Sequence, residues 1–326
     1  MGADISKEVI QFCPLMERIK CIYLNAATKK IIDETSIKLE VDDFLISQIS
    51  TSALEKWMIL CNHISFIMND SKICSMFNLK FHSTKIVSLP RLKIVHIYWD
   101  LYALGRFPVS AHNNFLYEIL MFAQKNLEEF QILCPFDYTH YVVKMLLNLG
   151  QFPKVSKLSI DTWPTEDADK ILGKIFPNVQ TLNYLDKGED TNQAHCRPNV
   201  YFKWSSLRTL QWIGHCKHIY HNPFEYSFLP PVMDCLQLEP ISNVRLHHLL
   251  KCEIFVNKLI LGSIVYSKLP STTKPSRKHL KCMDCTIALR WQPQTSEIID
   301  HIDIDVDCTC AMQLFCLLAQ VEFFQS

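Results

Sequence analysis

One short segment is written twice in this chain. Residues 152–160 read FPKVSKLSI and residues 176–184 read FPNVQTLNY, so the second copy begins 24 residues (176 − 152) after the first. Both share one frame: a proline, an apolar residue two positions later, and apolar residues three and five positions beyond that. The final alternation is typical of a β-strand with one buried face. A strand that recurs at a regular interval predicts a repeat protein, in which neighbouring units stack to bury their apolar faces.

The same frame recurs along much of the chain. We call its three apolar residues the first, second and third core positions. From residue 127 onward, the first core positions are Leu127, Val155, Val179, Leu207, Met233, Val256 and Leu280. They are separated by 28 (155 − 127), 24 (179 − 155), 28 (207 − 179), 26 (233 − 207), 23 (256 − 233) and 24 (280 − 256) residues. These intervals lie within the range of about 20–29 residues that is typical of leucine-rich repeats.

The spacing between copies of the frame is less regular in the first third of the chain. LPRLKIVHI gives a clear copy of the frame at Leu92, and CPLMERIKC gives another at Met16. Weaker strand copies are predicted at Met76–Leu79–Phe81, Leu54–Trp57–Ile59, Leu280–Met283–Cys285 and Ile299–Ile302–Ile304. We therefore predict an irregular N-terminal repeat or cap region over residues 1–70 and one continuous solenoid over residues 71–326.

Helical patterns lie between the predicted strands. Residues 115–126 place Leu116, Ile119, Leu120 and Ala123 on one helical face. Residues 165–176 repeat this pattern after Thr165, a suitable N-cap, and YVVKMLLNLG ends at Gly150, a suitable C-cap. Units of strand, turn and helix predict an α/β solenoid, with a curved parallel sheet inside and helices outside.

These units resemble leucine-rich repeats of the longer, helix-bearing type. The segments CPLMERI and FPNVQTL are similar to those that open the repeats of F-box leucine-rich proteins, and the resemblance covers roughly residues 72–305. The chain departs from the family at Tyr184 and Trp212, where leucine is preferred, and no F-box pattern precedes the repeats. The resemblance implies a surface that recognises proteins and, in its sharper form, a substrate receptor that joins a ubiquitin-ligase adaptor.

Composition narrows the function. Lys+Arg and Asp+Glu both number 33, so the formal net charge is zero, whereas nucleic-acid binders usually carry a basic excess. The sequence contains no GxxxxGK[ST] or GxGxxG motif, which are typical of nucleotide-binding loops, and no GxSxG motif, which is typical of a catalytic serine. No apolar run reaches the roughly 18–20 residues of a membrane span, and no signal peptide opens the chain. We expect no nucleic acid, membrane or cofactor as a partner, and a location in the cytoplasm or nucleus with the 14 cysteines mostly buried and reduced.

Clusters of histidine and cysteine leave an alternative open: a metal-binding protein or an enzyme. The candidate ligands are His215, Cys216, His218 and His221, the pair His247 and His248 near Cys252, and the set Cys282, Cys285, Cys308 and Cys310. Histidines at the rim of a solenoid and cysteines in its core explain these clusters more simply. The acidic strand DHIDIDVD is likewise better explained by a solvated face than by a cation site. We therefore predict no metal site and no catalysis.

The predicted binding face follows from the strand register. Residues between the core positions point away from the core, toward the concave surface. They are His96, Tyr98, Glu129, Gln131, Lys157, Ser159, Asp161, Thr181, Asn183, Thr209, Gln211 and Lys258. Trp99 and Trp163 follow two of the strands and are predicted as aromatic anchors at the rim. This polar row of mixed charge suits a protein surface better than a phosphate backbone, so the sequence predicts a non-catalytic scaffold for protein–protein interaction.

Overall fold

A computed structural model gives the fold of this chain. It describes residues 37–68, 71–99, 114–133, 136–161, 168–186, 204–214, 229–239, 241–242, 249, 253–262, 264–265, 281–289 and 304–308. The chain divides into two compact units, residues 1–141 and 142–326. The division falls within helix α8 (Phe136–Leu149). The predicted frame at Met16 lies outside the described residues.

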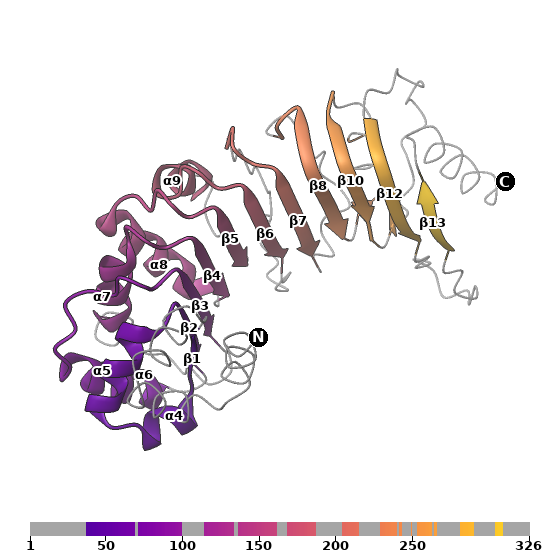
Figure 1. Cartoon of the computed structure of the whole chain (residues 1–326). Coiled ribbons are helices and arrows are strands. Elements are labelled where there is room, and N and C mark those ends of the chain that lie inside the picture. Colours follow the sequence, from indigo (N-terminus) through magenta and orange to yellow (C-terminus); the bar gives the residue numbers. More distant parts are fainter. Residues whose placement is uncertain are drawn as a thin grey trace, which may run out of the picture. The chain divides into compact units, whose positions relative to one another are not determined.

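The described part of the first unit is a parallel sheet with helices in its connections. The strands, in spatial and chain order, are β1 (Lys38–Val41), β2 (His63–Met68), β3 (Ile94–Trp99) and β4 (Glu129–Leu133). The helices are α4 (Asp43–Gln48), α5 (Thr51–Leu60), α6 (Ser71–His82) and α7 (Asn114–Ala123). They lie on one side of the strands (Figure 1). The predicted boundary between residues 70 and 71 falls inside this unit, between β2 and α6.

An aromatic cluster joins the sheet of the first unit to its helices. Phe66 of β2 contacts Phe77 of α6 and Phe115 of α7, with ring centroids 5.4 and 5.6 Å apart. All three rings are fully buried. The predicted helical face of α7 is confirmed, because Leu116, Ile119, Leu120 and Ala123 are all buried. Burial of several large side chains, each contributing about 1.5–3 kcal/mol, holds the helices on this face.

Two strands predicted in the first unit are helices instead. Leu54, Trp57 and Met58 are the buried residues of α5, and their spacing follows a helix turn. Among the described side chains of α6, Phe77 and Phe81 are buried and lie four residues apart, whereas Leu79 is 69% exposed. The true neighbour of β3 is β2, whose core positions are Cys61, Ile64 and Phe66. A cysteine at the first core position hid this copy from the pattern.

The second unit carries a longer sheet. Six of its described strands run parallel: β5 (Lys157–Asp161), β6 (Thr181–Asp186), β7 (Thr209–Gly214), β8 (Val232–Glu239), β10 (Phe255–Leu261) and β12 (Lys281–Leu289). The helix α9 (Ala168–Ile175) connects β5 to β6. Two short strands, β9 (Ile241–Ser242) and β11 (Ile264–Val265), pair separately. Figure 1 shows the long strands side by side.

The strand register aligns the core positions of successive repeats. Leu158 pairs with Leu182, which pairs with Leu210, and the column continues through Leu236 to Leu259. Each of these side chains is at most 1% exposed. The sequence prediction of a continuous apolar column through Leu158 and Leu182 is therefore confirmed. Tyr184 and Trp212 occupy the third core position, where their rings pack 4.7 Å apart between centroids.

The carboxyl-terminal end of the sheet departs from the prediction. Strand β12 exists, but its register pairs Cys282 with Val256 and Cys285 with Leu259. The first two core positions are therefore Cys282 and Cys285, two residues later than predicted. Strand β13 (Ile304–Cys308) runs antiparallel to β12, so β12 is the last parallel strand among the described residues.

A backbone motif recurs at the start of several described strands. The carbonyl oxygen one residue after the first core position accepts hydrogen bonds from two consecutive amides of the next repeat. Ser156 O accepts from Gln180 N and Thr181 N at 2.7 and 2.9 Å, and Gln180 O accepts from Arg208 N and Thr209 N at 2.8 and 2.9 Å. The same arrangement occurs at Ile37, Asn62, Lys93 and Arg208. We call it the shared-carbonyl motif; it identifies the repeats independently of their side chains.

The duplicated Phe-Pro segments form a second column just before the strands. Phe152 and Phe176 are both buried, with ring centroids 5.5 Å apart. In the next repeat Trp204 takes the same place, three residues before the first core position, and is 3% exposed. The helix that precedes Phe152 ends at Gly150, whose φ of 87° is a left-handed conformation that glycine adopts without strain. The predicted C-cap is therefore confirmed.

Within the described residues, no helix is long and apolar enough to cross a lipid bilayer.

Candidate functional site: the polar faces of the two sheets

Polar side chains line the face of the first sheet that points away from its core. His63 of β2, His96 and Tyr98 of β3, and Glu129 and Gln131 of β4 are all partly exposed there. The last four were predicted from the sequence. His63 was missed because β2 was not recognised, although the alternation around Ile64 and Phe66 could have revealed it.

Three of these side chains, His63, His96 and Glu129, join the buried Ser65 in one hydrogen-bonded chain across three strands. His63 Nε2 lies 3.1 Å from Ser65 Oγ and 3.2 Å from His96 Nδ1. The other nitrogen of His96, Nε2, lies 3.0 Å from Glu129 Oε1. Ser65 is 1% exposed, and the side chains of His96 and Glu129 are 14% and 18% exposed. The chain therefore runs from a buried hydroxyl to a partly exposed carboxylate, and we call it the imidazole relay.

His63 is uncharged near neutral pH. Burial, then the nearby His96 and Lys38, lower its pKa from 6.5 to about 4, while Glu129 and Glu40 oppose the shift. Burial disfavours the charged imidazolium because water can no longer solvate it. The contact with His96 acts in the same direction, since two imidazolium ions 3.2 Å apart would repel each other.

The imidazole relay does not have the geometry of a catalytic triad. In a triad, the base takes a proton from the nucleophile at one ring nitrogen and is oriented by a carboxylate at the other. Here Ser65 Oγ and His96 Nδ1 both approach the same nitrogen, His63 Nε2. Ser65 is also buried, so a substrate has no access to its hydroxyl. Nucleophilic catalysis by this serine is therefore disfavoured on geometric grounds.

A second polar pair lies beside the relay. Gln131 Nε2 donates a 3.2 Å hydrogen bond to the hydroxyl oxygen of Tyr98. A phenol that accepts a hydrogen bond can still donate its own proton, and the amide oxygen of the glutamine can still accept one. The pair therefore presents both hydrogen-bond donors and an acceptor. Two tryptophans were predicted as anchors at the rim. Trp99 is the last residue of β3, and Trp163 lies outside the described residues.

In the second unit, two polar rows cross the face of the sheet that points away from its core. The first joins Lys157, Thr181, Thr209, Cys235 and Lys258 in register. The second joins Ser159, Asn183, Gln211 and Gln237, and in it Asn183 Nδ2 donates to Ser159 Oγ at 3.1 Å. The predicted residues Thr181, Asn183, Thr209 and Gln211 are partly exposed, and Lys258 is exposed. These rows are the counterpart, in the second unit, of the polar face of the first.

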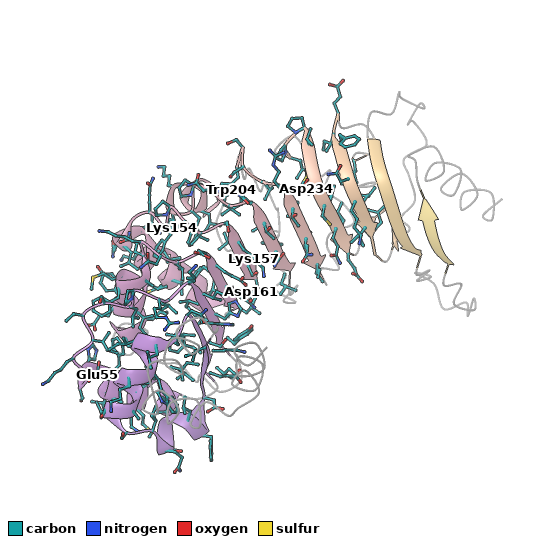
Figure 2. All side chains as sticks on the ribbon, viewed as in Figure 1. Glu55, Lys154, Lys157, Asp161, Trp204 and Asp234 are labelled. Atoms are coloured by element: carbon teal, nitrogen blue, oxygen red, sulfur yellow. The ribbon has the colours of Figure 1, made fainter. Side chains whose placement is uncertain are left out.

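Two predicted binding residues are not accessible. Ser159 is 4% exposed and Asp161 is 2% exposed, although both occupy outward positions on β5. The short Ser159 side chain is hydrogen-bonded by the longer Asn183 of the next strand. Lys157, on the same strand, remains partly exposed (Figure 2). The available surface on β5 is therefore Lys157 alone among the three predicted residues.

The described residues contain no group of three or more histidine, cysteine, aspartate or glutamate side chains that could hold a metal ion. The histidine clusters at residues 215–221 and 247–248 lie outside the described parts, as does Cys310. The β-register places Cys308 of β13 opposite Cys285 of β12. Cys61 and Cys235 are free thiols, the first buried and the second partly exposed.

Comparison with protein-family models and with curated proteins finds no match for this chain.

Proposed function

We propose that this chain is a non-catalytic recognition protein of the leucine-rich-repeat type, which binds a protein partner on the polar faces of its parallel sheets. The observation that carries the proposal is the constant register of the strands. Across the strands from β2 to β8, it places buried apolar residues on one face and mostly polar, partly exposed residues on the other. A face built this way changes its side chains without disturbing the core, which suits it to recognition.

The chemistry of the two polar rows favours a protein as the partner. Threonine, asparagine and glutamine supply both donors and acceptors, and Lys157 and Lys258 are the basic residues of the first row. A phosphate backbone calls for many basic side chains, whereas this chain has equal numbers of acidic and basic residues.

In its sharper form, the proposal makes the chain a substrate receptor of a ubiquitin ligase. That form rests on the resemblance of its Phe-Pro repeats to those of F-box leucine-rich proteins.

Affinity capture with matched variants tests the proposal. The face variant replaces Thr209 and Gln211 by arginine, two outward residues of β7 that are partly exposed. The control reverses the charge of Lys174, an exposed residue of α9. We expect proteins captured by the parent chain to be lost with the face variant and kept with Lys174→Glu. Both variants should unfold within about 1 kcal/mol of the parent, as surface substitutions usually do.

A variant on the helical side provides the opposing outcome. Leu79 of α6 is 69% exposed, and Phe44 of α4 is 75% exposed. If Leu79→Glu abolishes capture while the face variant leaves it intact, the partner binds the helices and the proposal is wrong. Recovery of a ubiquitin-ligase adaptor among the captured proteins would support the substrate-receptor form of the proposal. If other partners are captured without an adaptor, only the substrate-receptor form is wrong.

A further inference from the structure

In the imidazole relay, one ring nitrogen of His63 lies close to one ring nitrogen of His96 on the neighbouring strand. His63 and His96 lie on β2 and β3, which pair directly in the sheet (Figure 1). His63 Nε2 and His96 Nδ1 are 3.2 Å apart, and the rings meet edge to face with an interplanar angle of 72°. Because two nitrogens at this distance cannot both carry a proton toward the other, one of them presents a lone pair to the gap.

The separation matches that of two ligands on one transition-metal ion. Imidazole nitrogens bind zinc at about 2.0–2.1 Å, so two of them in a tetrahedral arrangement lie roughly 3.3–3.4 Å apart. The observed 3.2 Å requires only a small adjustment of the two rings. Imidazole is a ligand that Zn²⁺, Ni²⁺ and Cu²⁺ accept and that Mg²⁺ and Ca²⁺ do not favour.

Glu129 supplies the second feature of such a site. Its carboxylate lies 3.0 Å from Nε2 of His96, the nitrogen that faces away from His63. A carboxylate in this place keeps a proton on Nε2 and leaves the lone pair on Nδ1, directed toward His63. Histidines that bind metal usually have such a partner on the other ring nitrogen, and its loss typically weakens metal binding 10- to 100-fold.

We propose that His63 and His96 form a two-histidine binding site for a divalent transition-metal ion of the zinc class, with Glu129 as the positioning residue for His96. Ser65 Oγ, 3.1 Å from His63 Nε2, is an additional oxygen at the site. His63, His96 and Glu129 are all partly exposed, so the site can be reached from solvent. With two protein ligands, the site binds more weakly than a structural zinc site with four. The proposal is independent of the function proposed above, since it requires no protein partner.

Nuclear magnetic resonance of the full chain with ¹⁵N-labelled histidine tests this site directly. The 14 cysteines could also bind zinc, so a measurement of total metal content would be ambiguous. The imidazole nitrogen signals of His63 and His96 are identified by their loss in His63→Gln and His96→Gln. We expect both signals to shift together as Zn²⁺ is added, at lower Zn²⁺ concentrations than those of the other histidines, and to stay unchanged with Mg²⁺.

Two further variants keep the test decisive. Glu129→Gln should raise the Zn²⁺ concentration needed for the shift 10- to 100-fold while the protein stays folded. The matched control is His82→Gln, which removes a histidine 3.5 Å from a glutamate on a helix surface, and it should change nothing at His63 or His96. If the His63 and His96 signals move no earlier than those of other histidines, or if only one of them moves, the pair is a hydrogen bond and the metal site is refuted.

Discussion

The indole nitrogen of Trp204 donates a 2.8 Å hydrogen bond to the backbone carbonyl oxygen of Phe176, one repeat earlier. Trp204 stands where the two preceding repeats have Phe152 and Phe176, so the exchange of phenylalanine for tryptophan adds a polar contact to the aromatic column. Both partners of this bond are buried. The bond therefore fixes how one repeat sits on the next within the second unit.

Removing that bond should have a measurable cost. Trp204→Phe keeps an aromatic ring but leaves the Phe176 carbonyl without this donor, and we expect a loss of about 1–3 kcal/mol in the free energy of unfolding. Trp204→Ala should lose about 3–5 kcal/mol, because the large side chain is also gone. Urea denaturation of the parent and both variants measures the difference. The exposed neighbour Ser205 provides the control, and an equal effect of Ser205→Ala would contradict the assignment.

The apolar column predicts a large effect at its centre. Leu182 is 1% exposed and pairs in register with both Leu158 and Leu210. Leu182→Ala should reduce the free energy of unfolding by about 2–5 kcal/mol, through lost burial and the cavity that remains. Chemical denaturation checks this value against Gln180→Ala, an exposed substitution two residues away that should stay within about 0.5 kcal/mol. Similar losses for the two variants would refute the register.

Two residues of β5 should respond differently to charge reversal. Lys157 is partly exposed, so Lys157→Glu should leave the free energy of unfolding within about 0.5 kcal/mol of the parent. Asp161 is 2% exposed, and Asp161→Lys must place a different charge and a longer side chain in a buried position. We expect a loss of about 3 kcal/mol or more at Asp161. Thermal unfolding distinguishes them, and an Asp161→Lys protein as stable as the parent would show that this carboxylate is accessible.

His63 should make the protein less stable in acid. Its pKa is about 4 in the folded protein and near 6.5 when the chain is unfolded, so between these values only the unfolded chain binds the proton. Stability from this residue is therefore complete above pH 6.5 and declines as the pH falls toward 4. The stability lost through protonation of His63 is below about 3 kcal/mol, because water screens the charge of a half-buried side chain.

The comparison with His63→Gln isolates this effect. Urea denaturation in the presence of a metal chelator should show a weaker dependence on pH between 6.5 and 4 for His63→Gln than for the parent. His82→Gln, a variant of a histidine on the surface of α6, should retain the parent's dependence. Parallel pH profiles for all three proteins would mean that His63 titrates normally.

The thiols of Cys61 and Cys235 should differ in reactivity. Burial raises the pKa of Cys61 to about 12, and the side chain is fully buried, so almost no reactive thiolate is present at pH 8. Burial also raises the pKa of Cys235, but this thiol is partly exposed and Lys258 opposes the shift. A thiol reagent should label Cys235 at least about tenfold faster than Cys61, as measured by peptide mass spectrometry. Denatured and reduced protein should show all 14 thiols.

The sequence predicted the fold best where large apolar residues fill all three core positions. The frames from Leu127 to Val256 fall on the observed strands, because leucine, valine and phenylalanine at these positions have few alternatives to burial. The strand pattern was wrong at Met76–Leu79–Phe81, which lies in α6. Apolar residues at a helical spacing, Phe77 and Phe81, overlap the strand frame there. Local spacing then fits both a strand and a helix, and only packing of Phe77 against Phe66 decides between them.

The candidate site was only partly predictable. The outward positions of β3, β4, β6 and β7 followed from alternation alone. The contact between His63 and His96 did not, because it depends on β2, whose first core position is Cys61 rather than a leucine. Burial of Asp161 was also unpredictable, since the alternation of a strand fixes the direction of a side chain but not what covers it.

The shared-carbonyl motif has a consequence for how such a chain can change over time. Where it occurs, it fixes a new strand to the previous one at the first residues after the first core position. The connections can therefore differ in length, from 24 residues between Val155 and Val179 (179 − 155) to 35 between Leu92 and Leu127 (127 − 92), without shifting the strands. A longer or shorter connection would therefore leave the order of side chains on the sheet unchanged. A lineage could thus drift far in sequence and length and still present the same surface.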